Sequence, residues 1–361
     1  MKITGLDTTL VDVPLPAPVG TAIHTMRSVG CVLVRMSTDE GLVGESFVFT
    51  LDGVRLRVFD EMVRGLSAHA IGRDPHDVGA IWHEIWMAIN PTGHKGVTIA
   101  GLSAIDIACW DLIGKAAGQP LHRLFGACRD DVDTYATSGL WLSTPLDELA
   151  AEAQGYVDAG FRAVKLRIGS ARIDDDVERV RIVRDAIGPE IGLLVDANQA
   201  FSAKHAIRLG RRLDDFELTW IEEPVAVHDL AGSADVRAAL DTPIAAGETE
   251  YTRYGMQAML DARAADVLMP DLQRIGGYSE FRIASAAAAA RDVPVSSHFF
   301  TEYSLAVAGA TPNCISVEHV DWFAPLFTEE VELRDGRLVV PKRPGTGFTF
   351  RPDVEERFPF G

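Results

Sequence analysis

Three acidic residues, Asp196, Glu222 and Glu248, follow one another at steps of 26 residues, from 196 to 222 to 248. Each ends a short apolar run: GLLV, TWI and PIAAG. Three carboxylates held close together repel one another and raise each other's pKa unless a cation lies between them. Because oxygen ligands without Cys or His select a hard cation, this pattern predicts a site for Mg²⁺, with Mn²⁺ as a possible substitute.

Further polar residues end the neighbouring apolar runs. Lys165 and Arg167 share one face of the run before Asp196, since strand side chains repeat every two residues. Asp271, His298 and Glu318 end the last three runs. An Asp that accepts the imidazole N–H fixes the ring tautomer and raises its basicity, so we expect His298 to act as a general base.

The elements that must position these residues begin at about residue 131. Short runs rich in Val, Ile and Leu alternate there with helix-like segments of 12–18 residues. Apolar strands buried on both faces need parallel pairing and helical returns, which predicts a (β/α)₈-type barrel. The alternative, a doubly wound sheet, requires a Gly-rich phosphate turn, and none follows an early strand. The eight runs are 132–138, 163–169, 192–198, 218–224, 243–248, 266–272, 293–299 and 314–319.

The residues before the barrel form a different pattern. Alternating apolar and polar residues predict an antiparallel meander, and helical periodicity follows over 53–70, 75–90 and 97–117. We therefore predict an α+β capping domain over 1–125, the barrel over 126–325 and a tail over 326–361 that returns to the cap. A lid loop is expected at about 18–30, where His24 is a candidate contact to substrate hydroxyls.

Composition excludes several classes of protein. The 361 residues carry 52 acidic and 34 basic side chains, a net charge of −18, which disfavours binding to nucleic acid or to an anionic membrane. No stretch approaches the 18 apolar residues of a membrane span, and the start does not read as a secretory signal. The four cysteines have no CxxC spacing. We expect a cytoplasmic protein.

Several longer motifs occur in one order: AIDIACWDLIGKAAGQPLHRLFG (104–126), AVKLRIG, VDANQ, WIEEP, GE, PDLQRIGG and SSHFFTE. With these motifs the whole chain resembles the mandelate racemase-like subgroup of the enolase superfamily, the mandelate racemase/muconate lactonizing enzyme family. The resemblance implies an α+β cap on a modified TIM barrel, (β/α)₇β, with one Mg²⁺ per subunit on Asp196, Glu222 and Glu248. It also implies a homo-oligomer, with an octamer among the possibilities.

The resemblance also implies roles for single residues. Lys165 corresponds to the first lysine of the family's KxK motif, Asp271 and His298 to its dyad, and Glu318 to an acid that hydrogen-bonds the substrate carboxylate. Glu223 is expected beside the metal site rather than in it, because successive strand residues face opposite sides. Family placement makes three more residues substrate contacts or supports for the site: Thr137, Asn198 and Arg274.

The expected chemistry is abstraction of the α-proton of a carboxylate substrate through an enediolate, stabilised by Mg²⁺, Lys165 and a protonated Glu318. Arg167 stands where the racemase pattern has Lys, and an arginine stays protonated, which disfavours a two-base racemase. We therefore favour a lyase that dehydrates a sugar acid, an aldonate or aldarate, to a 2-keto-3-deoxy acid. The alternatives are a racemase or epimerase of a 2-hydroxy acid or amino-acid derivative, in which Arg167 only pairs with a ligand carboxylate, and a non-catalytic protein of this fold.

Overall fold

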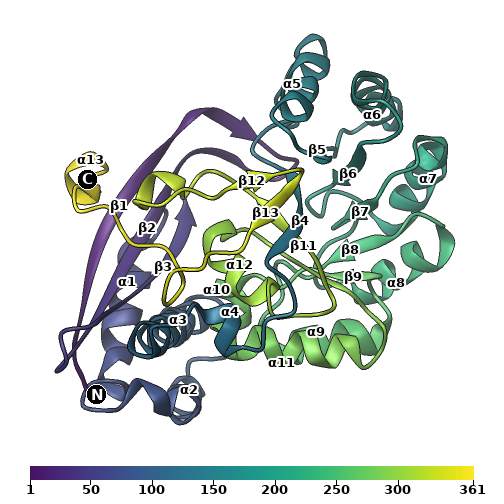
Figure 1. The fold of residues 1–361 in the computed structure, drawn as a ribbon. Helices are drawn as coiled ribbons and strands as arrows, with labels where there is room; N and C mark the ends of the chain where they lie inside the picture. The colour runs from purple at the N-terminus through teal and green to yellow at the C-terminus, as the bar shows by residue number, and fades with distance from the viewer.

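A three-stranded antiparallel sheet opens the chain in the computed structural model, which describes residues 1–361. Its strands, β1 (Ile3–Gly20), β2 (Thr25–Thr38) and β3 (Val43–Leu51), lie in the order β1-β2-β3. The central strand β2 is buried along most of its length because its Val and Leu side chains face the cap helices on one side and the barrel on the other. Figure 1 shows the sheet arching beside the barrel.

The segment expected as a lid loop is mostly strand, which corrects the prediction for 18–30. Val19 pairs with Met26 and Gly20 with Thr25, so only residues 21–24 form the connection. Thr21 closes this tip, because its N–H donates to the His24 carbonyl (2.9 Å) and its Oγ1 accepts the His24 N–H (3.0 Å). The prolines before Val19 cannot donate to the strand ladder, and they gave this stretch its loop-like sequence.

Four helices complete the N-terminal part of the cap: α1 (Leu56–Leu66), α2 (Val78–Ile89), α3 (Val97–Ala117) and the short α4 (Leu121–Leu124). By length and composition α3 is one helix that could cross a membrane, contrary to the expectation that no stretch is apolar enough. Its most apolar window is 89% buried inside the protein, between β3, the other cap helices and the barrel. Packing in the cap therefore accounts for its composition.

Eight parallel strands form a closed barrel, which confirms the predicted fold class. Closure joins the last strand to the first, with Val317 beside Thr134 and Glu318 beside Tyr135. Each predicted run overlaps one strand. The strands are β4 (Asp131–Ala136), β5 (Ala163–Arg167), β6 (Gly192–Asp196), β7 (Trp220–Glu222), β8 (Ile244–Ala246), β9 (Val267–Leu268), β10 (Val295–Ser297) and β11 (Cys314–His319).

Helices surround the barrel and return the chain between strands (Figure 1). A single-turn helix, η4 (Ala324–Leu326), and no α-helix follows β11 before the tail, which gives the (β/α)₇β arrangement. The helices are α5 (Leu146–Asp158), α6 (Ile173–Ile187), α7 (Ala203–Leu213), α8 (Leu230–Ala239), α9 (Thr252–Ala262), α10 (Leu272–Ile275), α11 (Gly277–Ala289) and α12 (Thr301–Ala308). Other single-turn helices are η1 (Ser67–His69), η2 (Pro75–Asp77) and η3 (Asp214–Phe216).

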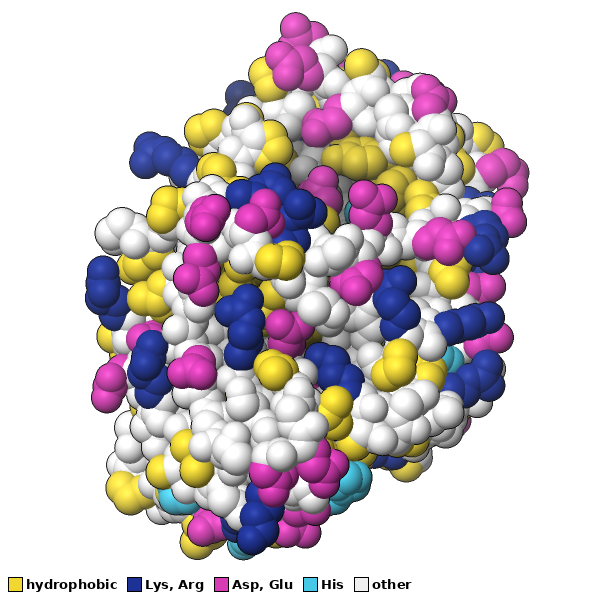
Figure 2. Space-filling view, turned by 60° about the vertical axis from the view of Figure 1, so that its left-hand side comes forward, with side chains coloured by type: hydrophobic (Ala, Val, Ile, Leu, Met, Phe, Trp, Pro, Cys, Tyr) yellow, Lys and Arg dark blue, Asp and Glu magenta, His cyan; other side chains and the backbone are white.

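The C-terminal segment contacts both bodies. The hairpin β12 (Leu333–Arg334) and β13 (Arg337–Val339) pairs antiparallel with β4, and α13 (Val354–Arg357) follows. Pro359 bridges to Val11 of β1, and Thr9 Oγ1 donates to Glu355 (2.7 Å). On the face drawn in Figure 2, basic and acidic side chains are interspersed over the surface.

Candidate active site

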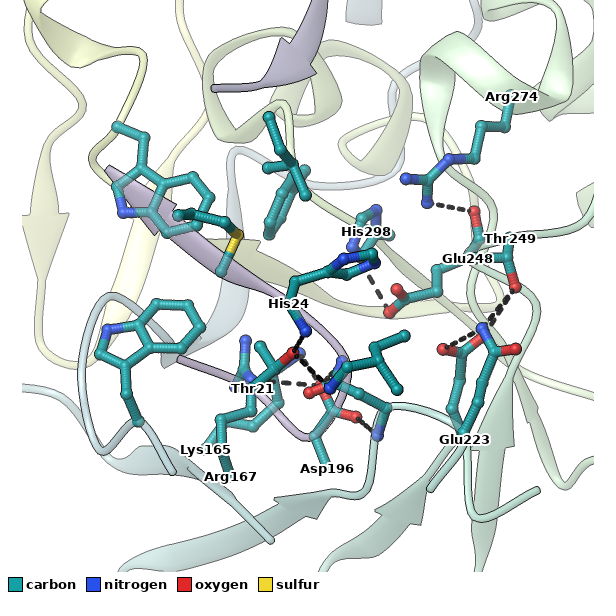
Figure 3. Close-up of a pocket in the computed structure, with 18 of the residues that line it drawn as sticks. Thr21, His24, Lys165, Arg167, Asp196, Glu223, Glu248, Thr249, Arg274 and His298 are labelled. Carbon is teal, nitrogen blue, oxygen red and sulfur yellow. Dashed lines mark hydrogen bonds and ion pairs between the residues drawn. The ribbon is translucent and has the colours of Figure 1, made fainter. Parts of the chain in front are cut away.

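A cavity of about 120 Å³ lies between the hairpin tip of the cap and the carboxyl ends of the barrel strands. In Figure 3, Thr21 and His24 of the tip reach over Asp196, while Arg274, Glu248 and Glu223 approach from the opposite side. The cap contributes a largely apolar wall to this cavity: Thr21, Ile23, His24, Met26, Phe49 and Leu51.

The three predicted acids lie together at the bottom of the barrel mouth. One oxygen from each of Asp196, Glu222 and Glu248 lies within 4.8 Å of the others, and all three side chains are buried. The register of β5, β6 and β7 places Arg167, Asp196 and Glu222 side by side at one level. Residues that lie one βα unit apart in the sequence are therefore neighbours in the barrel.

Their electrostatics fit a divalent cation. Burial, followed by the charges of neighbouring acids, raises the pKa of Glu248 to about 7, and burial raises that of Glu222 to about 8 although Lys165 opposes it. Burial and mutual repulsion raise these pKa values, and a cation bound between the carboxylates would favour their ionised forms. An oxygen-only donor set in this condition suits Mg²⁺, whose ligands would be Asp196, Glu222 and Glu248.

Lys165 and Glu318 form a buried ion pair beside the acids. Lys165 Nζ lies 2.6 Å from Glu318 Oε1 and 2.7 Å from Glu222 Oε1. Burial disfavours the ammonium charge, but Glu222 and Glu318 outweigh it, so the pKa of Lys165 lies above its ordinary value. Burial also opposes the Glu318 charge, yet Lys165 and His298 lower the pKa of Glu318 to about 2. The adjoining Lys165 ammonium thus favours an ionised Glu318, and the protonated form expected from the resemblance stays a prediction.

Arg167 is fixed on three sides. Its Nε lies 3.3 Å from Asp196 Oδ2, its Nη2 donates to Thr137 Oγ1 (3.1 Å), and its guanidinium carbon lies 4.6 Å from the centre of the Trp141 ring. The side chain is only 3% exposed, and Nη1 has no hydrogen-bond partner. The pairing with Asp196 and the contact with Thr137 leave the Nη1 group available for a hydrogen bond to a ligand.

His298 and Asp271 form the predicted dyad. His298 Nδ1 lies 2.7 Å from Asp271 Oδ2, while Asp271 Oδ1 accepts the N–H groups of Gln273 and Arg274 at the start of α10. An acceptor carboxylate at Nδ1 assigns the N–H of the neutral ring to that nitrogen and leaves Nε2 without a proton. Burial opposes the imidazolium, but Glu248 and Asp271 outweigh it, so the pKa of His298 is raised.

The remaining predicted residues also reach the site. Asn198 Nδ2 donates to Asp196 Oδ2 (3.1 Å), and Arg274 Nη1 donates to the Glu248 carbonyl (2.7 Å). His24 lines the cavity but is exposed at the hairpin tip.

Glu223 differs from its expected orientation. Strand β7 ends at Glu222 and Glu223 has φ 39°, so strand alternation no longer applies and its side chain also lines the cavity. Its carboxylate accepts hydrogen bonds from Thr249 Oγ1 (2.8 Å) and Gln199 Nε2 (3.0 Å). Burial raises the pKa of Glu223 to about 7.

Five lining residues carried no prediction from the sequence. Gln199 and Thr249 directly follow Asn198 and Glu248, so their adjacency to predicted residues was an available signal. The other three are large apolar residues without a distinguishing pattern: Leu51, Phe299 and Trp322.

Comparison with known proteins agrees with this description. Fold and acid cluster together define a capped barrel of the enolase superfamily. Residues 5–126 match the mandelate racemase/muconate lactonizing enzyme N-terminal domain, and residues 148–354 match the enolase C-terminal domain-like model. The chain therefore belongs to the mandelate racemase/muconate lactonizing enzyme family.

Two of the following three relatives are named as dehydratases and one as an epimerase. L-talarate/galactarate dehydratase of Salmonella typhimurium is 35% identical, with 96% of this chain and 89% of that protein aligned. Its solved structure with Mg and L-lyxarohydroxamate superposes with TM-score 0.95 at 34% identity, covering 99% of this chain and 93% of that one. Arabinonate dehydratase of Saccharolobus solfataricus is 31% identical (94% and 92% aligned), and L-Ala-D/L-Glu epimerase of Bacillus subtilis is 29% identical (96% of each).

Proposed function

We propose that this protein is a Mg²⁺-dependent hydro-lyase that dehydrates a sugar acid, an aldonate or aldarate, to a 2-keto-3-deoxy acid. The observation that carries the proposal is the asymmetry of the barrel mouth. The His298–Asp271 dyad offers a base on one side, while β5 offers Arg167, which cannot accept a proton at ordinary pH. The dehydratases among its relatives and the Mg bound to one of them support the same reaction.

The residues of the chain divide the work as follows. Lys165 offers positive charge to the substrate carboxylate, and Arg167 Nη1 offers a further charged N–H group. His298 Nε2 accepts the α-proton while Asp271 holds the Nδ1–H group and stabilises the imidazolium. Mg²⁺ on the three acids would supply Lewis-acid stabilisation of the charge that develops on the carboxylate.

The same imidazolium then completes the dehydration. Nε2–H donates its proton to the departing β-hydroxyl, so that the α-proton and the hydroxyl leave as one water molecule. The product is an enol, which releases its hydroxyl proton and takes a proton at the β-carbon to give the 2-keto-3-deoxy acid. One base thus suffices, and His298 ends the cycle neutral.

A racemase or epimerase of a 2-hydroxy acid or amino-acid derivative is the second candidate. Lys165 also lines the cavity, across the mouth from His298, and an epimerase is among the relatives. A lysine serves as second base only when neutral, and its raised pKa works against that role. A catalytically inactive protein of this fold is the third candidate.

The proposal extends to the cellular context. We infer a cytoplasmic homo-oligomer, an octamer among the possible forms, whose partner is a small carboxylate rather than nucleic acid or a membrane. The net charge of −18 supports the exclusion of polyanions.

A panel of mono- and diacid sugars with Mg²⁺, with and without EDTA, tests the function. A dehydratase releases a keto acid that forms a semicarbazone, and EDTA abolishes its release. Recovery of the opposite epimer carrying solvent deuterium, with no keto acid, would establish the racemase instead. If no acid gives either product, the third candidate, a catalytically inactive protein of this fold, is supported.

A further inference from the structure

The two polar groups that flank the reaction site are joined by a continuous line of aromatic contacts, which we name the aromatic arc (Trp141, Trp322 and Phe299). Arg167 lies over the Trp141 ring, and Trp141 stacks on Trp322 with ring centres 5.5 Å apart. Trp322 meets Phe299 edge-on at 5.4 Å, and Phe299 stacks on His298 at 4.1 Å. All of these side chains line the cavity, so the arc fixes its shape between Arg167 and His298.

Trp141 has no regular element to hold it. It lies in the loop between β4 and α5, where Leu140 takes φ 53°, a conformation that a leucine rarely adopts without outside support. Its indole Nε1 donates only to the nearby Ser138 carbonyl (3.1 Å). The position of its ring over Arg167 must therefore come from groups outside the loop.

Arg179 of α6 supplies that support. Its guanidinium donates to three main-chain carbonyls: Trp141 (2.6 Å), Thr144 (3.0 Å) and Arg167 (3.3 Å). The side chain is only 5% exposed, and one planar group thereby ties the loop to the end of β5. One helical turn earlier, buried Asp176 accepts the N–H groups of Gly169 and Ser170, which holds the chain just after β5.

The loop that Arg179 holds is also hydrogen-bonded to the cap. Leu142 N–H donates to the Gly20 carbonyl (2.9 Å), and Gly20 N–H donates to Ser143 Oγ (3.0 Å). The loop that Arg179 holds therefore also anchors the β1–β2 hairpin tip through these two hydrogen bonds.

We propose that Arg179 is a positioning residue for catalysis, which holds Trp141 beneath the Arg167 guanidinium so that Arg167 Nη1 stays directed at the substrate. This inference rests on the proposed function only for its kinetic readout. A displacement of about 1 Å in such a group is enough to cost one or two orders of magnitude in rate. Arg179 itself touches neither the cavity nor the acids, so its effect must pass through Trp141 and Arg167.

The chain offers a matched control on the same helix. Arg184 also donates to main-chain carbonyls, those of Gly188, Ile191, Phe216 and Glu217, but at the far end of α6 from the cavity. We expect both R179K and R184K to lower the thermal midpoint, because each loses hydrogen bonds to main-chain carbonyls, with the smaller loss in R184K, whose hydrogen bonds are only part-buried. Only R179K should lower kcat/KM for the dehydrated acid, by about tenfold or more.

A double-mutant cycle with W141F separates positioning from a general loss of stability. If Arg179 acts through Trp141, R179K should cost less than about threefold in kcat/KM in the W141F background. Equal losses in both backgrounds would overturn the proposal, as would equal losses in R179K and R184K.

A readout without substrate keeps the test independent of the reaction. Stacked indoles give an exciton couplet in far-ultraviolet circular dichroism, and the part that W141F removes belongs to Trp141 and Trp322, since the Trp82–Trp86 stack remains. R179K should weaken the component of the couplet that comes from Trp141 and Trp322, and R184K should leave it unchanged. A protein that dehydrates no acid yet shows this pattern would refute the proposed function alone. An unchanged couplet in R179K of an active enzyme would refute the role of Arg179 alone.

Discussion

His298 Nε2 lies 3.4 Å from Glu248 Oε2, so the proposed base faces one of the three acids proposed to hold the metal. In this state the acid cluster is balanced by side chains: His298 beside Glu248, Lys165 beside Glu222 and Arg167 beside Asp196. A divalent cation on the acids would compete with these contacts and leave Nε2 to the substrate. Metal binding and availability of the base are thus linked through Glu248.

Metal removal should therefore affect both activity and stability. We expect EDTA to abolish turnover and Mg²⁺ at about 100 times its Kd to stabilise the fold by about 3 kcal/mol, seen as a rise of a few degrees in the thermal midpoint. Differential scanning calorimetry with and without Mg²⁺ checks this. In E248Q the Mg²⁺-dependent rise should shrink, whereas an undiminished rise would remove Glu248 from the ligand set.

The dyad should be indispensable for proton transfer. H298N is expected to lower kcat by about 10³-fold or more, and D271N by about 10²-fold, because the first removes the base and the second its orienting acceptor. The Mg²⁺-dependent thermal shift serves as the control and should persist in H298N. Retention of more than a tenth of wild-type turnover in H298N would exclude it as the base.

Arg167 decides between one-base and two-base chemistry. The substitution R167K introduces a titratable amine. It should lower the rate of dehydration about tenfold or more, because the guanidinium makes the contacts with Thr137 and Trp141. The variant should also place deuterium from D₂O at the α-carbon of recovered substrate, with some inversion. Nuclear magnetic resonance of substrate recovered at partial conversion measures both. A wild-type enzyme that already inverts its substrate would contradict the one-base mechanism.

Buried Glu302 should make stability depend on pH. Burial raises its pKa to about 8, and Asp321 adds to the shift. The folded protein thus holds this proton more tightly than the unfolded chain, so its stabilising effect is complete below pH 4.5 and is lost as pH rises through 8. We expect E302Q to match the wild type near pH 5 and to exceed it at pH 8 by up to about 3 kcal/mol in free energy of unfolding.

Urea denaturation at both pH values checks the Glu302 prediction. Replacement of Glu330, an exposed acid of the tail that lies outside the cavity, by Gln should give no such pH-dependent gain. A gain in E302Q that is equal at pH 5 and pH 8 would show that the effect is not titration of this carboxyl.

The barrel and its acids were predictable because each lies in a local pattern. An apolar run ending in a charge recurs at the spacing of one βα unit, and parallel closure brings those ends together. The side chain of Glu223 points toward the cavity, which strand alternation did not predict, since β7 ends one residue earlier than the apolar run suggests. The hairpin at 18–30 was missed because Pro14, Pro16 and Pro18 are typical of a loop, although strand pairing resumes at Val19. Arg179 and Trp322 had no local signal, since each acts through partners far away in sequence.

Closure of the barrel also dictates an order of events during synthesis. Thr134 of the first barrel strand donates its hydroxyl proton to the Val317 carbonyl of the last, 183 residues further on. Until β11 leaves the ribosome, β4 and β10 both remain open sheet edges, and contacts of such large sequence separation form slowly. The acid cluster on β6, β7 and β8 is complete well before then. Nascent chains of this protein therefore pass through an unclosed seven-stranded sheet with charged strand ends, whose two open edges favour aggregation.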